Sequence, residues 1–241
     1  MTESMERAPA LTRGRQPIAS VRHTVILVAI LLAIAGYGAY LQSHAGSSPQ
    51  LVEKHPSAIP LYLSLMAAQW GLVRYVTIGM KHGGTRLRDL LGQRWSSWKD
   101  VARDVVIALI VWGAWSLSAG AVERALGGDT AKGITTLLPR SPAEIAVWIL
   151  LSMTAGFCEE MVFRGYLLRQ FEALSGNALV GVLGQAVIFG VAHGYQGLRN
   201  VIAITVYGTV FGAVAVWRKS LKPGMILHAW TDIFGGIFAK G

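Results

Sequence analysis

The segment "GFCEEMVFRG" at residues 156–165 places two adjacent carboxylates and an arginine against an apolar run. Ionisable residues inside such runs are functional candidates, because charged groups are costly in hydrocarbon. On an α-helix Glu160 and Arg164 share a face and can form an ion pair, whereas Glu159 points about 100° away from Glu160. The spacing therefore predicts that Arg164 holds Glu160 in an ion pair, whereas Glu159 lies outside this pair and could act as a general base or a metal ligand. The alternative is that both glutamates lie at the water interface and end the helix.

His193 ends the next apolar segment, and the turn "SGN" at 175–177 separates it from the glutamates. Residues equidistant from the turn of an antiparallel helical hairpin lie at equal height, and residue 176 is midway between 159 and 193. Glu159 and His193 are therefore predicted to face each other. A lone histidine at a helix end is more often structural, so this shared height is what makes His193 a candidate. Gly190 and Gly194 flank it and would let a neighbouring helix come close.

The last apolar segment, "PGMILHAWTDIFGG", carries His228 and Asp232 four residues apart on one helical face. Asp232 is predicted to accept a hydrogen bond from one ring nitrogen of His228, which fixes the tautomer and leaves the other nitrogen facing the cavity. The alternative is a local His–Asp hydrogen bond near the surface. An upright helix before this segment would leave His228 about 16 Å below His193 at 1.5 Å per residue. Bringing the two histidines together requires that helix to be strongly tilted.

The composition is that of a membrane protein. Hydrophobic residues make up 53% of the 241 residues and charged residues 15%, whereas about a quarter of the residues in a soluble domain are charged. The net charge of +9 does not indicate nucleic acid, because the basic residues lie between the apolar segments rather than on one module. The single cysteine, Cys158, excludes an intramolecular disulfide and a multi-cysteine metal site.

The elements that must position these residues are seven apolar segments, most of them near the 20 residues or so that span a bilayer. We predict an all-α polytopic membrane protein of about seven transmembrane helices, over 24–42, 58–80, 101–121, 142–160, 178–193, 200–217 and 223–239. The fifth and seventh are the shortest, which is typical of tilted, re-entrant or protein-surrounded segments. Three regions follow: a flexible cytoplasmic tail (1–20) without signal-peptide features, N-terminal membrane helices (21–140) and a catalytic helical core (141–241).

The distribution of basic residues predicts the orientation. Lysine- and arginine-rich short loops stay in the cytoplasm. The side that carries the N-terminal tail holds 14 Lys and Arg residues and the opposite side holds 6. We therefore predict a multi-pass protein of the cell membrane with a cytoplasmic N-terminus.

Three motifs occur in order on successive apolar segments: "EExxxR" (Glu159, Glu160, Arg164), "FxxxH" (Phe189, His193) and "HxxxD" (His228, Asp232). Together they resemble the CPBP family of intramembrane proteases, which includes the type II CAAX prenyl endopeptidases and bacteriocin-processing proteins. The resemblance covers roughly 141–241. It implies a helical membrane fold with a polar cavity and peptide-bond hydrolysis, in which Glu159 and His193 activate water and His228 faces the developing oxyanion. Eukaryotic members have asparagine at the last position, and an ionised Asp232 cannot donate a hydrogen bond in its place.

We thus predict an intramembrane endopeptidase whose partners are the lipid bilayer and a membrane-associated protein or peptide substrate. The predicted catalytic residues are Glu159, Glu160, His193, His228 and Asp232, with Arg164 and Phe189 structural.

Alternatives remain open. Glu159, His193 and His228 could instead bind zinc and leave one position for water, and the sequence does not separate a zinc-dependent from a metal-free mechanism. A non-enzymatic immunity or scaffold protein of the same fold is a second alternative. A proton-coupled transporter is the third, although no inverted repeat is visible. Nothing in the sequence selects among prenylated proteins, bacteriocin leaders and other membrane peptides as substrates.

Overall fold

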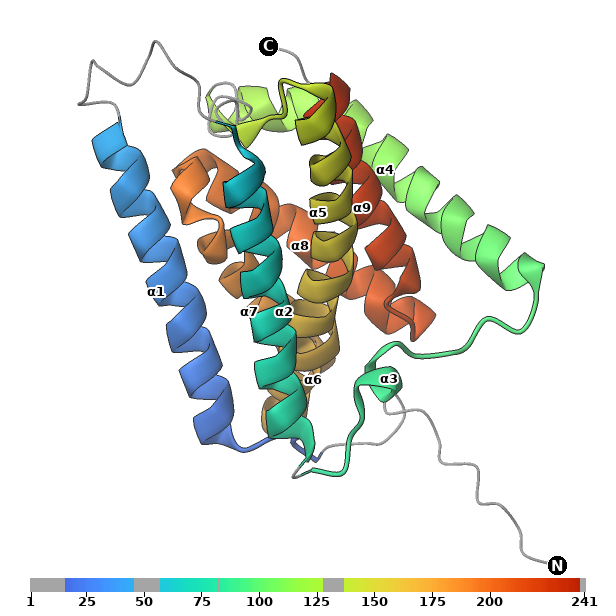
Figure 1. Cartoon of the computed structure of the whole chain (residues 1–241). Helices are drawn as coiled ribbons and strands as arrows, with labels where there is room; N and C mark the ends of the chain where they lie inside the picture. The colour runs from blue at the N-terminus through green and yellow to red at the C-terminus, as the bar shows by residue number, and fades with distance from the viewer. Residues whose placement is uncertain (1–15, 46–56, 82, 128–136, 239–241) are drawn as a thin grey trace, which may run out of the picture.

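Each of the seven predicted apolar segments corresponds to one helix of the computed structural model (Figure 1). The structure describes residues 16–45, 57–81, 83–127 and 137–238, so most of the predicted tail lies outside the described residues. Those residues contain no β-strand, and one isolated bridge joins Gly92 and Ser220. The elements are α1 (Val21–Ala45), α2 (Ile59–Lys81), α3 (Leu87–Leu90), α4 (Trp98–Leu126), α5 (Pro142–Glu160), the π-helical segment η4 (Met161–Leu167), α6 (Leu168–Ser175), α7 (Ala178–Ala192), the 3₁₀ turn η5 (Gly194–Gln196), α8 (Leu198–Arg218) and α9 (Lys222–Phe238).

Four stretches are long and apolar enough to cross a membrane: Val21–Leu41, Trp98–Leu126, Pro142–Ser175 and Leu198–Arg218. Of the seven helices that match the predicted segments, α7 with 15 residues and α9 with 17 are the shortest, as predicted. The all-helical membrane character is confirmed for the described residues, and the count of seven spans stays a prediction.

Local sequence sets the ends of the hairpin that carries the predicted site. Ser141 accepts a hydrogen bond from the Glu144 backbone N–H at 3.2 Å, and the Glu144 carboxylate accepts one from the Ser141 N–H, which caps the start of α5. At the other end Gly176 adopts a φ of +71°, which favours glycine, and ends α6. The Asn177 side chain then accepts a hydrogen bond from the Leu179 N–H at 2.8 Å and starts α7. The predicted reversal at 175–177 is therefore present.

Glycines allow the helices around this hairpin to pack closely. A Cβ on Gly156 of α5 would lie 2.8 Å from the Met225 carbonyl oxygen of α9. A Cβ on Gly190 of α7 would lie 2.6 Å from the Val201 carbonyl oxygen of α8. Only residues without a side chain allow these approaches. Gly194, the other predicted contact glycine, faces open space, so the prediction is right for one of the pair.

Helix α4 is attached to the bundle through α9 and through one buried carboxylate. Asp104 of α4 accepts hydrogen bonds from Arg218 of α8, with Nη2–Oδ1 at 2.6 Å, and from Trp95 Nε1 at 2.8 Å. The end of α4 that follows α3 lies out to the side, and from there α4 slants toward the upper ends of α5 and α9, whereas α8 crosses obliquely behind α2 and α5 (Figure 1). The oblique course of α8 agrees with the tilt that the sequence requires.

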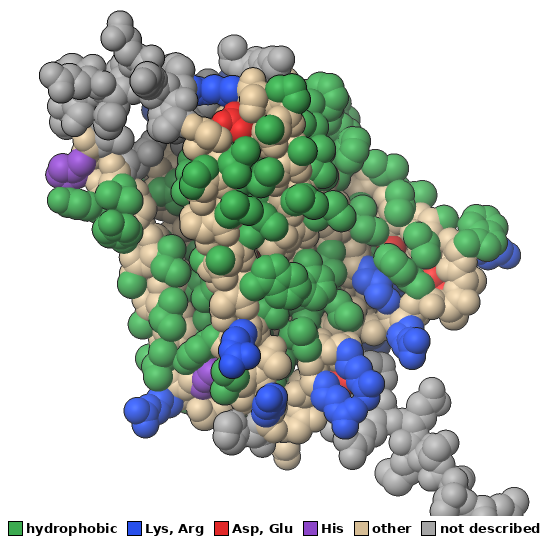
Figure 2. Space-filling view, in the orientation of Figure 1, with side chains coloured by type: hydrophobic (Ala, Val, Ile, Leu, Met, Phe, Trp, Pro, Cys, Tyr) green, Lys and Arg blue, Asp and Glu red, His purple; other side chains and the backbone are tan. Residues whose placement is uncertain are grey.

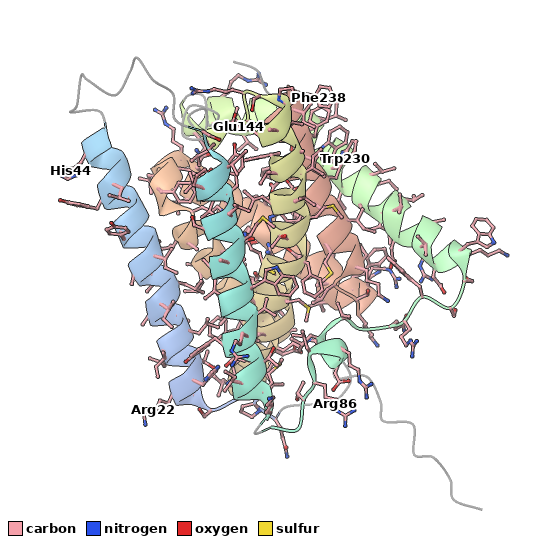
Figure 3. The ribbon with its side chains drawn as sticks, in the orientation of Figure 1. Arg22, His44, Arg86, Glu144, Trp230 and Phe238 are labelled. Carbon is pink, nitrogen blue, oxygen red and sulfur yellow. The ribbon has the colours of Figure 1, made fainter. Side chains whose placement is uncertain are left out.

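Charge is distributed unevenly along the bundle. Hydrophobic side chains cover the middle of the visible face, and lysine and arginine side chains gather at the end where α1 begins (Figure 2). Arg22 and Arg86 lie at that end, and His44 and Glu144 lie at the opposite one (Figure 3). This asymmetry agrees with the distribution of lysine and arginine residues among the predicted loops. That this end of the bundle faces the cytoplasm stays a prediction.

Candidate active site

Glu159 and Glu160 are the last two residues of α5, directly before the π-helical segment η4. A π-turn adds a residue to the helical repeat and occurs frequently at functional sites. The sequence pattern predicts an uninterrupted α-helix here and does not indicate this change of pitch. Every residue of η4 is buried, which makes this turn part of the protein interior rather than a frayed helix end. Glu160 is fully buried, and the side chain of Glu159 is 19% exposed. Glu160 therefore does not lie at the water interface, as the alternative interpretation of the sequence requires.

Arg164 forms the predicted ion pair with Glu160. Arg164 Nη1 lies 2.9 Å from Glu160 Oε1, and both side chains are buried. The guanidinium lies between two aromatic rings, 4.2 Å from the centre of Phe189 and 4.8 Å from that of Phe211, where cation–π attraction stabilises it. Gly208 leaves room for this arrangement, since a Cβ there would lie 3.3 Å from Arg164 Nη2.

His228 of α9 is the residue that the carboxylates approach. Its Nδ1 lies 3.2 Å from Glu160 Oε1, and its Nε2 lies 3.7 Å from Glu159 Oε2 and 3.7 Å from Asp232 Oδ2. A carboxylate only accepts, so the hydrogen bond with Glu160 places a proton on Nδ1. This corrects the prediction for Asp232: Glu160 makes the hydrogen bond that fixes the ring. The i,i+4 spacing brings Asp232 near the ring but leaves it beyond hydrogen-bond distance.

His193 follows the last residue of α7 and is fixed by its own helix. Its Nδ1 bonds to the Phe189 carbonyl oxygen at 2.8 Å, so Nδ1 carries the proton and Nε2 keeps a free lone pair. The Phe189 ring contacts both histidines, with centroids 4.7 Å from His193 and 5.9 Å from His228. Within the described residues His193 makes no hydrogen bond or ion pair with Glu159. The predicted meeting of Glu159 and His193 across the hairpin therefore stays a prediction.

Gln69 of α2 is a site residue that the sequence analysis missed. Its Nε2 donates to Glu159 Oε1 at 2.9 Å, so Glu159 is held on one oxygen rather than free as predicted. The remaining oxygen, Oε2, is buried without a hydrogen-bond partner among the described residues. An amide within the apolar stretch "SLMAAQWGLV" is the signal that could have found Gln69.

The protein-family model for "Type II CAAX prenyl endopeptidase Rce1-like" matches residues 141–234. These residues are similar to that endopeptidase domain and are called the Rce1-like domain. The domain contains Glu159, Glu160, Arg164, Phe189, His193, His228 and Asp232, and the resemblance to the CPBP family is thereby confirmed. Neither the curated proteins nor the solved structures give a match.

The Rce1-like domain accounts for most of the site but not for all of it. Gln69 lies outside the matched residues, on a helix that packs along α5. Two aromatic pairs hold these helices together, Tyr62 with Trp148 at 5.4 Å and Trp70 with Phe157 at 5.6 Å between ring centroids. The domain thus receives one side chain of its polar centre from the N-terminal helices.

The zinc alternative finds no support in the geometry. Among the described residues no group of three or more His, Cys, Asp and Glu side chains is arranged to hold a metal ion. Of the three predicted ligands, Glu159 and His228 are neighbours, whereas His193 bonds to the Phe189 carbonyl.

Proposed function

We propose that this protein is an intramembrane endopeptidase that hydrolyses peptide bonds of membrane-associated proteins or peptides. The observation that carries the proposal is the imidazole of His228, set against the carboxylates of Glu159 and Glu160 among apolar helices. The Rce1-like domain supplies the class of reaction.

Glu159 acts as the general base in this proposal. Its Oε2 takes a proton from water, and the hydroxide attacks the carbonyl carbon of the scissile bond. Since Nδ1–H of His193 is bound to the Phe189 carbonyl, its Nε2 can accept a hydrogen bond from the other O–H of the water and hold the water in line. The C–N bond then breaks, and the leaving nitrogen takes the proton from Glu159.

His228 stabilises the oxyanion. Its Nδ1–H is bound to Glu160 and its Nε2 faces the space next to Glu159 and Asp232, so as the imidazolium, with a proton on each ring nitrogen, it can donate to the oxyanion from Nε2. A donor held in place before the reaction contributes most where charge develops. Glu160 thus orients His228, and Arg164 with Phe189 holds Glu160 in turn.

The test is Glu159→Gln, which keeps the volume of the side chain and removes the base. Cells that produce the wild type or the variant are compared for new N-termini of membrane and secreted proteins by mass spectrometry. We expect termini that depend on wild-type protein and a loss of rate of about 10²- to 10⁴-fold for the purified variant. Glu172→Gln on α6 is the control, since Glu172 is not part of the site. Identical termini from wild type and Glu159→Gln would instead indicate a non-enzymatic protein of the same fold.

A further inference from the structure

Gln69 differs from an ordinary glutamine between membrane helices. Amides on such helices commonly serve as packing contacts, and Gln170 of α6 is an example in this protein. Gln170 Oε1 accepts from the backbone N–H groups of Ile18 and Ala19, and its Nε2 donates to the Ala19 carbonyl at 2.8 Å. Gln69 Oε1, by contrast, is buried without a partner in the described part of the chain. Within residues 16–45, 57–81, 83–127 and 137–238, the one hydrogen bond that Gln69 makes is with the carboxylate of Glu159.

The chemistry of this bond fixes the direction of the Gln69 amide. A carboxylate oxygen only accepts, so the NH₂ group must face Glu159 and the carbonyl must face away. Hydrogen bonds to charged acceptors are about twice as strong as neutral ones. Gln69 therefore donates a hydrogen bond to Oε1 of Glu159, and Oε2 is left as the oxygen that can take a proton.

The helix that carries Gln69 is held firmly against α5 on both sides of this bond. Trp70 packs on Phe157 next to it, and Tyr62 packs on Trp148 about two turns away. Tyr62 also donates to the Leu137 carbonyl oxygen at 2.6 Å. Side chains fixed by such packing hold catalytic groups within the narrow tolerance that reaction requires.

We propose that Gln69 is a positioning residue of the active site, which holds the Glu159 carboxylate so that Oε2 faces the attacking water. This inference rests on the proposed function. It assigns part of the catalytic apparatus to α2, outside the Rce1-like domain at 141–234.

The test uses Gln69→Met, which keeps the length of the side chain and removes the donor. The substrate is a labelled peptide that spans a cleavage site found in the comparison of termini. We expect kcat to fall about 10- to 100-fold with KM nearly unchanged, because the carboxylate is misplaced while the peptide still binds. Gln170→Met is the matched control, since it removes more hydrogen bonds without contact to Glu159. Its kcat per folded protein should stay near the wild-type value.

A second variant, Gln69→Ala, supplies a chemical rescue. Acetamide contains the atoms that this truncation removes, and it should restore part of kcat, whereas N,N-dimethylacetamide has no N–H donor and should not. Gln69→Met with wild-type kcat, while Glu159→Gln is inactive, would overturn the role of Gln69 and leave the proposed function intact. An equal loss in Gln170→Met would also overturn it. Full activity of Glu159→Gln would overturn the proposed function and this inference together.

Discussion

Arg164→Met tests whether the buried ion pair with Glu160 holds the site together. Arg164 is 1% exposed, with Glu160 2.9 Å away and two aromatic rings on its faces. Breaking a buried pair by removing one partner costs about 3–5 kcal/mol, because the other charge stays buried. Glu160 keeps His228 as a hydrogen-bond partner at 3.2 Å, and methionine still packs against Phe189 and Phe211. We therefore expect the lower end, about 3 kcal/mol.

For a chain of this length such a loss lowers the melting temperature by about 6–12 °C. Cys158 provides the assay, since it is the only cysteine in the sequence and is 1% exposed. A thiol-reactive dye that fluoresces on reaction reports unfolding as Cys158 becomes accessible during heating in detergent.

The double variant Glu160→Gln, Arg164→Met distinguishes a stranded charge from lost packing. It leaves no unpaired ion, and the amide oxygen at position 160 can still accept from His228 Nδ1–H, so it should melt above Arg164→Met. Arg169→Met is the matched control. Arg169 is a buried arginine that donates to the backbone carbonyls of Asp89 and Leu90, so its loss strands no carboxylate and should cost less. A double variant that melts no higher than Arg164→Met would refute the reasoning.

Two further predictions concern Asp232 and the orientation in the membrane. Asp232→Asn should keep activity within about 10-fold, because Glu160 rather than Asp232 bonds to the His228 ring. Activity that is restored only by added zinc after chelation would contradict the metal-free mechanism. Loss of a carboxylate beside a metal site weakens metal affinity about 10–100-fold. In Arg88→Cys, a membrane-impermeant maleimide should label the exposed residue 88 only after the cells are made permeable, so that the reagent reaches the cytoplasmic side. The buried Cys158 gives little background labelling. Labelling of intact cells would reverse the predicted orientation.

The features predicted well from the sequence are those with local causes. Long apolar runs gave the helices, and the "SGN" turn gave the hairpin because Gly176 and Asn177 have specific roles at helix ends. The ion pair of Glu160 and Arg164 also depends on a spacing of four residues within one chain segment. Each of these features depends on residues that lie within a few helical turns of one another in the sequence.

The features that were missed depend on packing between distant segments. Gln69 and Glu159 are 90 residues apart, and no local pattern joins them. The partner of His228 depends on how α9 lies against α5, which the closeness of Gly156 to Met225 determines. The π-helical pitch of η4 has no marker in a hydrophobic pattern, because every residue in it is buried.

The position of the two glutamates explains why adjacent residues can have different roles. His228 presents Nδ1 to Glu160 and Nε2 to Glu159, so one imidazole lies between two carboxylates that diverge from the same turn. Arg164 offsets the charge of Glu160 alone, since it bonds to that carboxylate and is enclosed by Phe189 and Phe211. Among the described residues Glu159 accepts a hydrogen bond from the neutral amide of Gln69, and its other oxygen lies 3.7 Å from His228 Nε2, beside the more exposed Asp232. The carboxylate without an arginine partner is therefore the one left to take a proton from water.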